Sequence, residues 1–572
     1  MTSDAQTTQP PPTRAGGLLA RAGWIALPLF ITAAAGFVRF WRLGSPHKIV
    51  PLDETYYAPN SLGYLCHGSD MTFVRANAPH TCAGLDPAFA VHPPVGKLLT
   101  AIGIKIFGYR PFGWRFAAAV VGTLSILLVY GIARRLWTAR WPAVVASVLV
   151  AADGLFFVQS RLAMLDIFLA FFVLLGVWLL LEDRARAPGW VGPRWWRLAA
   201  GAAFGLAIAS KWAAAPMLPV VAAVALASEA VRIRDEGTAL ATAAKPAGEK
   251  PSGEKDEWST PGPEFWGPEG GNEAGTRWIA SWPRRAVARV KAYLRHTFVD
   301  RRSSVTFQAL ALVGTFAILP VLIYVASYTP WFLSTKRYVP PRCNDIVATG
   351  VSTRPVPKAG ISLWLCDQKE IFDYHRNLKA VDEKGNPVHP YMSKAWSWPW
   401  ISRPASHYFE TNCEPGRTTT MPCPKGTLPR DEEILGLPNP AIWWVGFFIA
   451  LPACLFWMIK RQDEVAALLI VLFAPLVVPW FVYSRPIFMF YMTPALPFLV
   501  LMVVHALQKW RLRWSAVAFV AIAISLFGYF YPVLAAVPLP SKGAWGWESR
   551  IWYGHVLRGD CTSAGIKLLC WI

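Results

Sequence analysis

Charge is scarce in this chain: only 16% of its 572 residues are Asp, Glu, Lys or Arg, whereas 54% are hydrophobic. A soluble protein of average composition carries about 25% charged residues, which it needs to cover its surface. Apolar runs of about 20 residues recur along the whole sequence, and that is the length a helix needs to cross the hydrocarbon layer. The composition therefore excludes an ordinary soluble protein and predicts an all-α integral membrane protein.

Short motifs that mark three common enzyme classes are also missing. The sequence contains no Asp-x-Asp pair of the kind that holds a metal-bound nucleotide sugar, no Walker-type phosphate loop and no His-Glu-x-x-His zinc motif. We therefore expect no metal site, and nothing in the sequence requires a cofactor.

The apolar segments predict eleven membrane-spanning helices. We place them at residues 24–41, 116–133, 142–159, 162–181, 198–213, 215–230, 306–328, 441–458, 465–483, 487–506 and 515–533. The split near residue 214 is the least certain, because "AAAPMLPVVAAV" fits either one kinked helix or two. The amphipathic stretch 91–113 is too interrupted to span, and we expect an interfacial helix there on the outer face.

Lysine and arginine set the expected orientation. They occur before the first predicted span, after the second and fourth, and in later short loops, and cytoplasmic loops are rich in these residues. Eleven crossings then give a cytoplasmic N-terminal tail (1–23) and an external C-terminal tail (534–572). The net charge of +21 is mostly topological, because basic loops are attracted to the anionic inner leaflet, so we expect no nucleic-acid partner. No small-residue cleavage site follows the first segment, which predicts an uncleaved helix.

Eight of the nine cysteines form pairs that are close in sequence, and each pair lies in a segment predicted to be external. The pairs are Cys66/Cys82, Cys343/Cys366, Cys413/Cys423 and Cys561/Cys570. Disulfides persist in oxidising compartments, so this placement supports the predicted topology. Neighbour pairing is the simplest of many possible connectivities. Metal binding is the alternative, but no Cys-x-x-Cys spacing favours it. Cys454 lies inside a predicted span and is expected to be a packed thiol.

Hydrophilic segments divide the chain further. Residues 24–230 form an N-terminal membrane module with a first external loop at 42–115. Residues 231–304 are basic and rich in Gly, Pro, Glu and Lys, which predicts a largely disordered cytoplasmic loop. A single helix at 305–328 leads to 329–440, which we expect to be an external subdomain containing disulfides. Residues 441–533 hold the C-terminal membrane helices.

Several ionisable residues fall near the predicted outer membrane edge, where charge is costly and is usually paired or functional. They are Asp53, Glu54, His92, Lys97, Arg115, Arg161, Asp166, Lys211 and Arg485. Snorkelling at helix ends is the alternative explanation for any one of them. Their convergence on one face predicts a cavity for an anionic lipid headgroup, with a carboxylate available as a general base.

Nine ordered motifs carry a resemblance that runs from about residue 30 to about residue 560. They are "LDETYYA", "VHPPVGKLL", "GWRF", "QSRLAMLD", "ASKWAAAP", "DYHRNLK", "HPYMSKAWSWPWISRP", "LPNPAIWW" and "SRPIFMFYMTPALPF". In this order they resemble the protein O-mannosyltransferase family, and the later ones its bacterial, actinobacterial-type branch. The large external β-trefoil insertion of eukaryotic members is missing, because 329–440 is too short to hold it. The bacterial members also lack it.

The resemblance implies a GT-C glycosyltransferase fold and activity. Such enzymes move mannose from polyprenyl-phosphate-mannose to Ser or Thr hydroxyls of exported proteins and invert the anomeric centre. The partners implied are this lipid donor, secreted or membrane acceptor proteins with Ser/Thr/Pro-rich segments, and membrane lipids. The implied location is the plasma membrane, with the active site on the extracytoplasmic face. The missing Asp-x-Asp pair fits a lipid-linked donor.

Chemistry then assigns expected roles to the candidate residues. Asp53 is the expected base, since a hydroxyl is a poor nucleophile until a positioned carboxylate takes its proton. Glu54 would orient the acceptor or nearby basic groups. Arg115 and Lys211 are expected to stabilise the departing lipid phosphate, because fixed cations act strongly in a water-poor site. Arg161 and Arg485 are further candidates for this role, and Asp166, His92 and Lys97 complete the expected substrate site.

Structural roles remain open for some of these residues. Glu54 would serve only as a cap if a helix begins near Thr55. Arg161 and Asp166 are five residues apart, and a structural role for both would be to pair with each other. His92 precedes two prolines, where a purely conformational role is equally compatible with the sequence.

Other functions also fit part of the pattern. A related GT-C enzyme that transfers arabinose or aminoarabinose from a polyprenyl-phosphate donor to an envelope glycolipid or polymer would share the early Asp-Glu pair. The "HPYMSKAWSWP" and "LPNPAIWW" motifs disfavour it. A transporter would show internal repeats and charges at the bilayer midplane, and neither is seen. A scaffold subunit would not need the clustered charges.

The predicted topology is testable in intact cells. A cysteine introduced near Gly270 should resist a membrane-impermeant thiol reagent, because the 231–304 loop is expected to be cytoplasmic. A cysteine introduced near Gly385 in the external segment provides the positive control. Ready labelling at Gly270 would invert the orientation.

Overall fold

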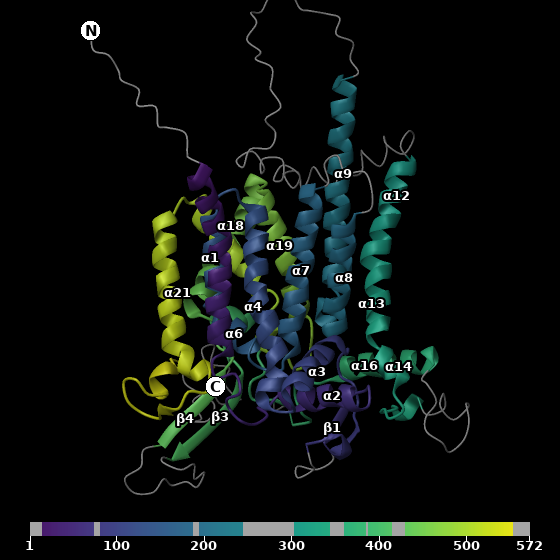
Figure 1. The fold of residues 1–572 in the computed structure, drawn as a ribbon, viewed down its shortest axis with the longest axis vertical. Coiled ribbons are helices and arrows are strands. Elements are labelled where there is room, and N and C mark those ends of the chain that lie inside the picture. The colour runs from purple at the N-terminus through teal and green to yellow at the C-terminus, as the bar shows by residue number, and fades with distance from the viewer. Residues whose placement is uncertain are drawn as a thin grey trace, which may run out of the picture.

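The computed structural model describes residues 14–73, 80–186, 194–243, 302–343, 360–384, 387–413 and 429–552. Near-parallel helices form a bundle, and the shorter elements collect at one end of it (Figure 1). The principal bundle helices are α1 (Arg14–Phe40), α4 (Pro111–Leu136), α7 (Leu165–Arg186), α8 (Trp195–Ser210), α9 (Met217–Ala243), α12 (Arg302–Val313), α13 (Leu319–Ser327), α19 (Glu464–Val477), α20 (Leu496–Lys509) and α21 (Arg513–Leu534).

Seven helical stretches in the described part of the chain are long and apolar enough to cross a membrane. They are Pro111–Leu136, Leu165–Arg186, Trp212–Arg232, Gln308–Ser327, Pro440–Arg461, Glu464–Phe481 and Arg513–Leu534. Shorter apolar helices occupy Ala26–Phe40, Trp141–Ala151 and Leu496–Lys509. Apolar side chains such as Leu310, Leu322 and Val517 are exposed on the outer helices. Lipid tails solvate such surfaces, so their exposure fits helices that border a bilayer.

The single helix predicted at 142–159 is wrong. The chain instead forms α5 (Trp141–Ala151) and α6 (Gly154–Gln159), separated by Asp153. One carboxylate oxygen of Asp153 accepts from the Phe156 amide at 2.9 Å, and the other accepts from the Asn439 amide at 2.9 Å. An N-cap of this kind starts a new helix, because it satisfies amides that have no partner within the helix. The predicted span 142–159 contains Asp153 and does not anticipate this break.

A break at Lys211 confirms two helices rather than one kinked helix between 198 and 230. Helix α8 ends at Ser210, a 3₁₀ turn covers Trp212–Ala214, and α9 begins at Met217. Helix α9 also continues to Ala243, beyond the expected start of the 231–304 loop, and residues 244–301 lie outside the described part.

The connecting elements form a layer at one end of the bundle (Figure 1). It contains α2 (Glu54–Cys66), α3 (Val95–Phe107), α14 (Thr329–Leu333), α16 (Ile361–Asn377) and a 3₁₀ segment at Ala395–Trp400. Helix α3 confirms that the 91–113 stretch is helical. The segments 42–115 and 329–440 thus meet here, whereas α9 ends and α12 begins at the opposite end (Figure 1).

Two small antiparallel sheets depart from the all-α prediction. Strand β1 (Met71–Phe73) pairs with β2 (Leu85–Pro87), and β3 (Ser406–Cys413), β4 (Pro429–Leu435) and β5 (Leu539–Pro540) form a sheet in the order β3-β4-β5. Strand β5 belongs to the predicted external tail, so this part of the tail packs against the predicted external subdomain. Strands of two to eight residues without regular alternation give little sequence signal.

Cysteine pairing follows sequence proximity where the chain is described. Cys66 is bonded to Cys82, and Cys343 to Cys366. Cys413 is also in a disulfide, while Cys423 and the pair Cys561/Cys570 lie outside the described residues. Cys454 is a buried free thiol, as predicted.

Two further helices complete the bundle. Helix α17 (Pro440–Val445) continues through a π-helical turn at Gly446–Ala450 into α18 (Leu451–Phe456). Helix α7 packs between α4 and α8, and α20 packs against α5 and α19. One continuous apolar core therefore joins the N-terminal and C-terminal halves beneath the layer of connecting elements.

Candidate active site

The adjacent acids Asp53 and Glu54 have opposite environments. The carboxylate of Glu54 is fully buried and accepts from the amides of Val50 and Ala163 at 2.9 and 3.1 Å. It also accepts two hydrogen bonds from Arg115, at 2.9 Å from Nε and 2.8 Å from a terminal nitrogen. Glu54 is therefore a structural acid and not a helix cap, since its oxygens are already occupied.

Arg115 holds the first external loop. Besides Glu54, its guanidinium donates to the carbonyls of Leu43, Ser45, Pro46 and Lys48 at 3.0–3.3 Å. A guanidinium has five N–H donors in a fixed fork, and these contacts use them in full. The expectation that Arg115 binds the lipid phosphate does not fit this geometry, because no donor remains for a ligand.

Arg161 ties the end of α1 to the turn before α7. Its guanidinium donates to the carbonyls of Arg39, Trp41 and Arg42 at 2.7, 2.6 and 3.1 Å. The last carbonyls of a helix have no partner within the helix, so a buried arginine there is a structural cap. Arg161 does not pair with Asp166, which is bonded to Lys211, and its terminal nitrogens are engaged by backbone carbonyls.

Two of the three donors of Lys97 are engaged by the protein. Its ammonium forms an ion pair with Asp70 and donates to the His92 carbonyl at 2.7 Å. Tyr64 donates to the second oxygen of Asp70 at 2.8 Å. The pair joins α3 to the turn before β1, so Lys97 positions the backbone of His92. Sequence reasoning missed Asp70 because no motif contains it.

Asp53 differs from all of these residues. It is partly buried, and among the described residues its carboxylate makes no hydrogen bond and no ion pair. Burial raises its pKa to about 6, an effect that the charges of Lys211 and Arg485 oppose and that of Asp166 reinforces. A desolvated carboxylate with a free lone pair and a pKa near neutrality has the properties of a general base.

Lys211 lies at the break between α8 and α9, where it forms an ion pair with Asp166. Its ammonium donates to both carboxylate oxygens at 2.9 and 2.8 Å, and both side chains are buried. The ammonium also lies 4.4 Å from the ring centre of Tyr491. An ammonium has three donors, so one remains available for a ligand.

Two histidines and Arg485 form a second cluster. The rings of His92 and His375 stack with their centres 5.1 Å apart. The His375 Nε2 donates to the Val91 carbonyl at 2.9 Å, so Nδ1 is free to accept from Arg485 at 2.7 Å. Burial and the charge of Arg485 lower the pKa of His375 to about 4. Burial and the charge of Lys211 lower the pKa of His92 well below its usual range. Both rings are therefore neutral near pH 7.

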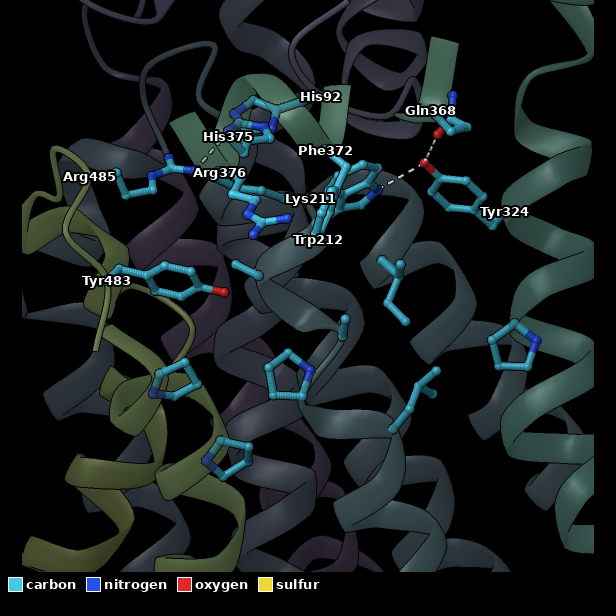
Figure 2. A pocket seen from close by; sticks show the side chains of 18 of the residues that line it. His92, Lys211, Trp212, Tyr324, Gln368, Phe372, His375, Arg376, Tyr483 and Arg485 are labelled. Carbon is cyan, nitrogen blue, oxygen red and sulfur yellow. Dashed lines mark hydrogen bonds between the residues drawn. The ribbon is translucent and has the colours of Figure 1, made fainter. Parts of the chain in front are cut away.

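These groups line one end of a cavity of about 860 Å³. Figure 2 shows His92, His375, Arg376, Arg485 and Lys211 gathered at the end that α16 covers. The rest of the wall is largely apolar and comes from α8, α9, α13 and α19 and the turn after α19. Its residues include Ile208, Leu218, Pro320, Val321, Pro475 and Pro479. The cavity thus combines an apolar groove with a cationic end.

Aromatic and polar side chains complete the wall near this end. Trp212 donates from its indole to Tyr324 at 2.8 Å, and Tyr324 donates to Gln368 at 2.5 Å (Figure 2). Arg376 has no hydrogen-bond partner among the described residues. His375 and Arg376 lie in "DYHRNLK", and Trp212 in "ASKWAAAP". The motifs contained these residues, but only their position on the cavity wall identifies them as site residues.

Comparison with known proteins decides the family. The profile of the family described as dolichyl-phosphate-mannose-protein mannosyltransferase matches residues 29–239. Polyprenol-phosphate-mannose--protein mannosyltransferases from Mycolicibacterium smegmatis and Mycobacterium tuberculosis are each 30% identical, over 95% and 93% of this chain and 94% and 91% of theirs. This chain belongs to the protein mannosyltransferase family.

Structural comparison agrees on the fold of this protein mannosyltransferase. The protein O-mannosyltransferase complex of S. cerevisiae bound to the sugar donor aligns over 90% of each chain, with a TM-score of 0.57 at 14% identity. The GT-C fold and multi-pass membrane character expected from the sequence are therefore confirmed. An undecaprenyl phosphate-aminoarabinose arabinosyl transferase from Pseudomonas aeruginosa is 34% identical, but over only 31% of each chain. The arabinose alternative is thus disfavoured.

Replacement of Arg115 by Ala tests its structural role. The change leaves the Glu54 carboxylate buried without its counter-charge, and breaking a buried pair in this way costs about 3–5 kcal/mol. We expect a clearly lower thermal unfolding midpoint in detergent. Arg110→Ala, at an exposed position beside the same helix, is the control and should have little effect. An Arg115→Ala enzyme with unchanged stability and weakened donor binding would restore the phosphate role.

Proposed function

We propose that this chain transfers mannose from polyprenyl-phosphate-mannose to Ser or Thr hydroxyls of exported proteins, with inversion at the anomeric carbon. Its membership of the protein mannosyltransferase family supports the reaction class. The observation that carries the proposal is that Asp53, whose raised pKa is opposed by the charges of Lys211 and Arg485, has no hydrogen-bond partner among the described residues, while Lys211 and Arg485 line the cationic end of a largely apolar cavity.

The cavity has the two environments that a lipid-linked sugar phosphate needs. A prenyl chain is stabilised by apolar contact, and Ile208, Val321 and Pro479 provide such a surface. A phosphate diester carries a negative charge, which fixed cations stabilise best where water is excluded. Arg485, Arg376 and Lys211 are the cations at the polar end. Of these, Arg376 has free donors, while Arg485 has a buried Nε without a partner.

The reaction is a single displacement. Asp53 accepts the proton of the hydroxyl as the hydroxyl oxygen bonds to C1 of mannose. The bond between C1 and the phosphate oxygen breaks, and the lipid phosphate leaves with the electron pair. Arg485 and Lys211 stabilise the charge that develops on it, while neutral His92 and His375 shape the wall without adding charge. Attack opposite the leaving group inverts C1.

The remaining predicted residues act by positioning. Glu54 and Arg115 fix the loop that carries Asp53, and Arg161 fixes the end of α1 from which that loop departs. Lys97 holds the backbone of His92, and Asp166 holds Lys211. We therefore assign substrate contact to Asp53, Lys211, His92 and Arg485, and add His375 and Arg376.

The proposal also includes the finer topology. Eleven crossings would put the N-terminus in the cytoplasm and the catalytic end of the bundle outside the cell. Oxidised cysteines at that end support this orientation, since disulfides persist in oxidising compartments. Acceptors would then be proteins emerging from the membrane with Ser/Thr/Pro-rich segments.

Asp53→Asn tests the base. The purified enzyme is incubated with radiolabelled polyprenyl-phosphate-mannose and a Ser/Thr/Pro-containing peptide, and transfer of label to the peptide is measured. The amide keeps the size of the carboxylate but accepts no proton, so transfer should fall by about 10²–10⁴-fold. Donor binding should persist, because the cations hold the phosphate. Near-normal transfer by this variant would exclude Asp53 as the base.

The pH profile provides an independent test. The base works only when deprotonated, so with a pKa of about 6 the value of kcat/KM should rise with pH up to about 6 and level off above it. His375, with a pKa of about 4, stays neutral across this range and adds no bend. The residual activity of Asp53→Asn should lack the bend. A profile that is flat between pH 5 and 7 would contradict the assignment.

A further inference from the structure

The cavity of about 860 Å³ that holds the proposed lipid donor is called the donor cavity below. A second cavity, of about 400 Å³, opens on the other side of α16. We call it the outer groove, and its principal residues are Phe89, Tyr338, Arg342, Glu370, Asp373 and Tyr374. None of them takes part in the chemistry described above. Its walls come from the turn after β2, the segment before the 3₁₀ turn at Pro341–Cys343, and α16.

Helix α16 is a wall shared by the two cavities. Phe372 and His375 line the donor cavity, whereas Glu370 and Tyr374 line the outer groove. Residues three or four apart share one face of a helix, so neighbours in sequence such as Tyr374 and His375 face different sides. A single helix therefore presents one set of side chains to the donor cavity and another to the groove.

Aromatic rings form the surface of the groove. Phe89 packs edge-to-face on Tyr338 and on Tyr374, with ring centres 5.9 and 5.5 Å apart. None of the three is fully buried, and Tyr374 is 41% exposed. Aromatic-lined grooves are the usual docking surface for extended, proline-containing peptides, because the rigid chain loses little entropy on binding.

The groove leads toward the free carboxylate. The pKa of Tyr374 is raised by burial and by its neighbour Tyr56, and the charge of Asp53 adds to this. Ring contacts connect α16 to α2: the ring centre of His92 lies 5.1 Å from that of His375 on α16 and 6.1 Å from that of Tyr57 on α2, four residues after Asp53. Tyr56 lies three residues after Asp53 on the first turn of α2 and is 64% exposed. Both helices thus carry an exposed aromatic ring: Tyr374 on α16, in the groove, and Tyr56 on α2, one turn after Asp53.

A disulfide fixes the geometry of the groove. Cys343 follows the segment that carries Tyr338 and Arg342, and it is bonded to Cys366 on α16. Arg342 also lies 3.7 Å from Glu370 across the same gap. The two walls are therefore held at a set separation, which suits a site that receives a ligand and not a space left by loose packing.

We propose that the outer groove binds the acceptor polypeptide, as an extended segment containing proline, and delivers its Ser or Thr hydroxyl to Asp53 from the side opposite the lipid donor. This inference rests on the proposed function, since it names the subsite of its second substrate. Tyr338 and Phe89 are the specificity-determining residues: their rings contact the peptide beyond the reacting hydroxyl.

The test compares three acceptors with wild-type enzyme and variants, using radiolabelled polyprenyl-phosphate-mannose. One peptide has prolines flanking its Ser/Thr, the second has alanine in their place, and the third is a short blocked peptide that does not reach the groove. Wild type should show the lowest KM for the proline peptide. Tyr338→Ala and Phe89→Ala should raise that KM about tenfold and remove the preference over alanine. The KM values for the donor and the short peptide should not change.

Two controls separate groove effects from folding effects. Tyr338→Phe keeps the ring and should keep the proline preference, and Trp545→Ala removes a more exposed aromatic side chain elsewhere. If wild type transfers mannose to none of the peptides, the proposed function itself fails. If it does transfer mannose, the groove assignment is overturned by Tyr338→Ala and Phe89→Ala variants that retain the preference. A rise in KM for the short peptide or for the donor would overturn it as well.

Discussion

The buried ion pair between Glu54 and Arg115 is the constraint on which the site depends. One carboxylate and one guanidinium join the start of α2, the turn at Ala163, the body of α4 and four carbonyls of the loop after α1. Such a pair costs desolvation energy, and its geometry must be good for the attraction to compensate. Here every donor and both oxygens are used. The main effect of the network is therefore to fix the position of Asp53, more than to stabilise the fold.

These fixed positions explain why the adjacent acids Asp53 and Glu54 have different chemistry. Glu54 is buried and accepts hydrogen bonds on both oxygens, while Asp53, one residue earlier, has no partner among the described residues and is influenced by the charges of Lys211 and Arg485. A carboxylate that formed a salt bridge would have a low pKa and a weak affinity for protons. Asp53 keeps its basicity because the bases around it are largely engaged elsewhere: Lys211 with Asp166, and Arg485 with His375 and Tyr491.

Much of this arrangement was predictable from sequence, and the reasons for the rest are physical. Apolar runs and basic loops predicted the helical membrane fold, and spacing predicted the disulfides Cys66–Cys82 and Cys343–Cys366. Residue type alone did not separate ligand-binding residues from structural ones: Arg115, Arg161 and Lys97 have the charge of phosphate ligands, but the structure engages most or all of their donors with backbone carbonyls and acids. The break at Asp153 was missed because a capping acid looks like any other interruption in an apolar run. His375 was missed because its importance comes from α16 folding over residues that are far away in the chain.

Helix α16 has a thermodynamic consequence of its own. Helix α16 forms a wall of both the donor cavity and the outer groove. Any shift of α16 when the donor phosphate binds Arg376 or His375 therefore also moves Tyr374. The binding free energies of the two ligands are then linked, and the linkage is reciprocal: whatever factor the lipid applies to the affinity of the peptide, the peptide applies to the affinity of the lipid. Product release follows the same rule in reverse. On the proposed function, release of one product changes the affinity for the other by the same factor.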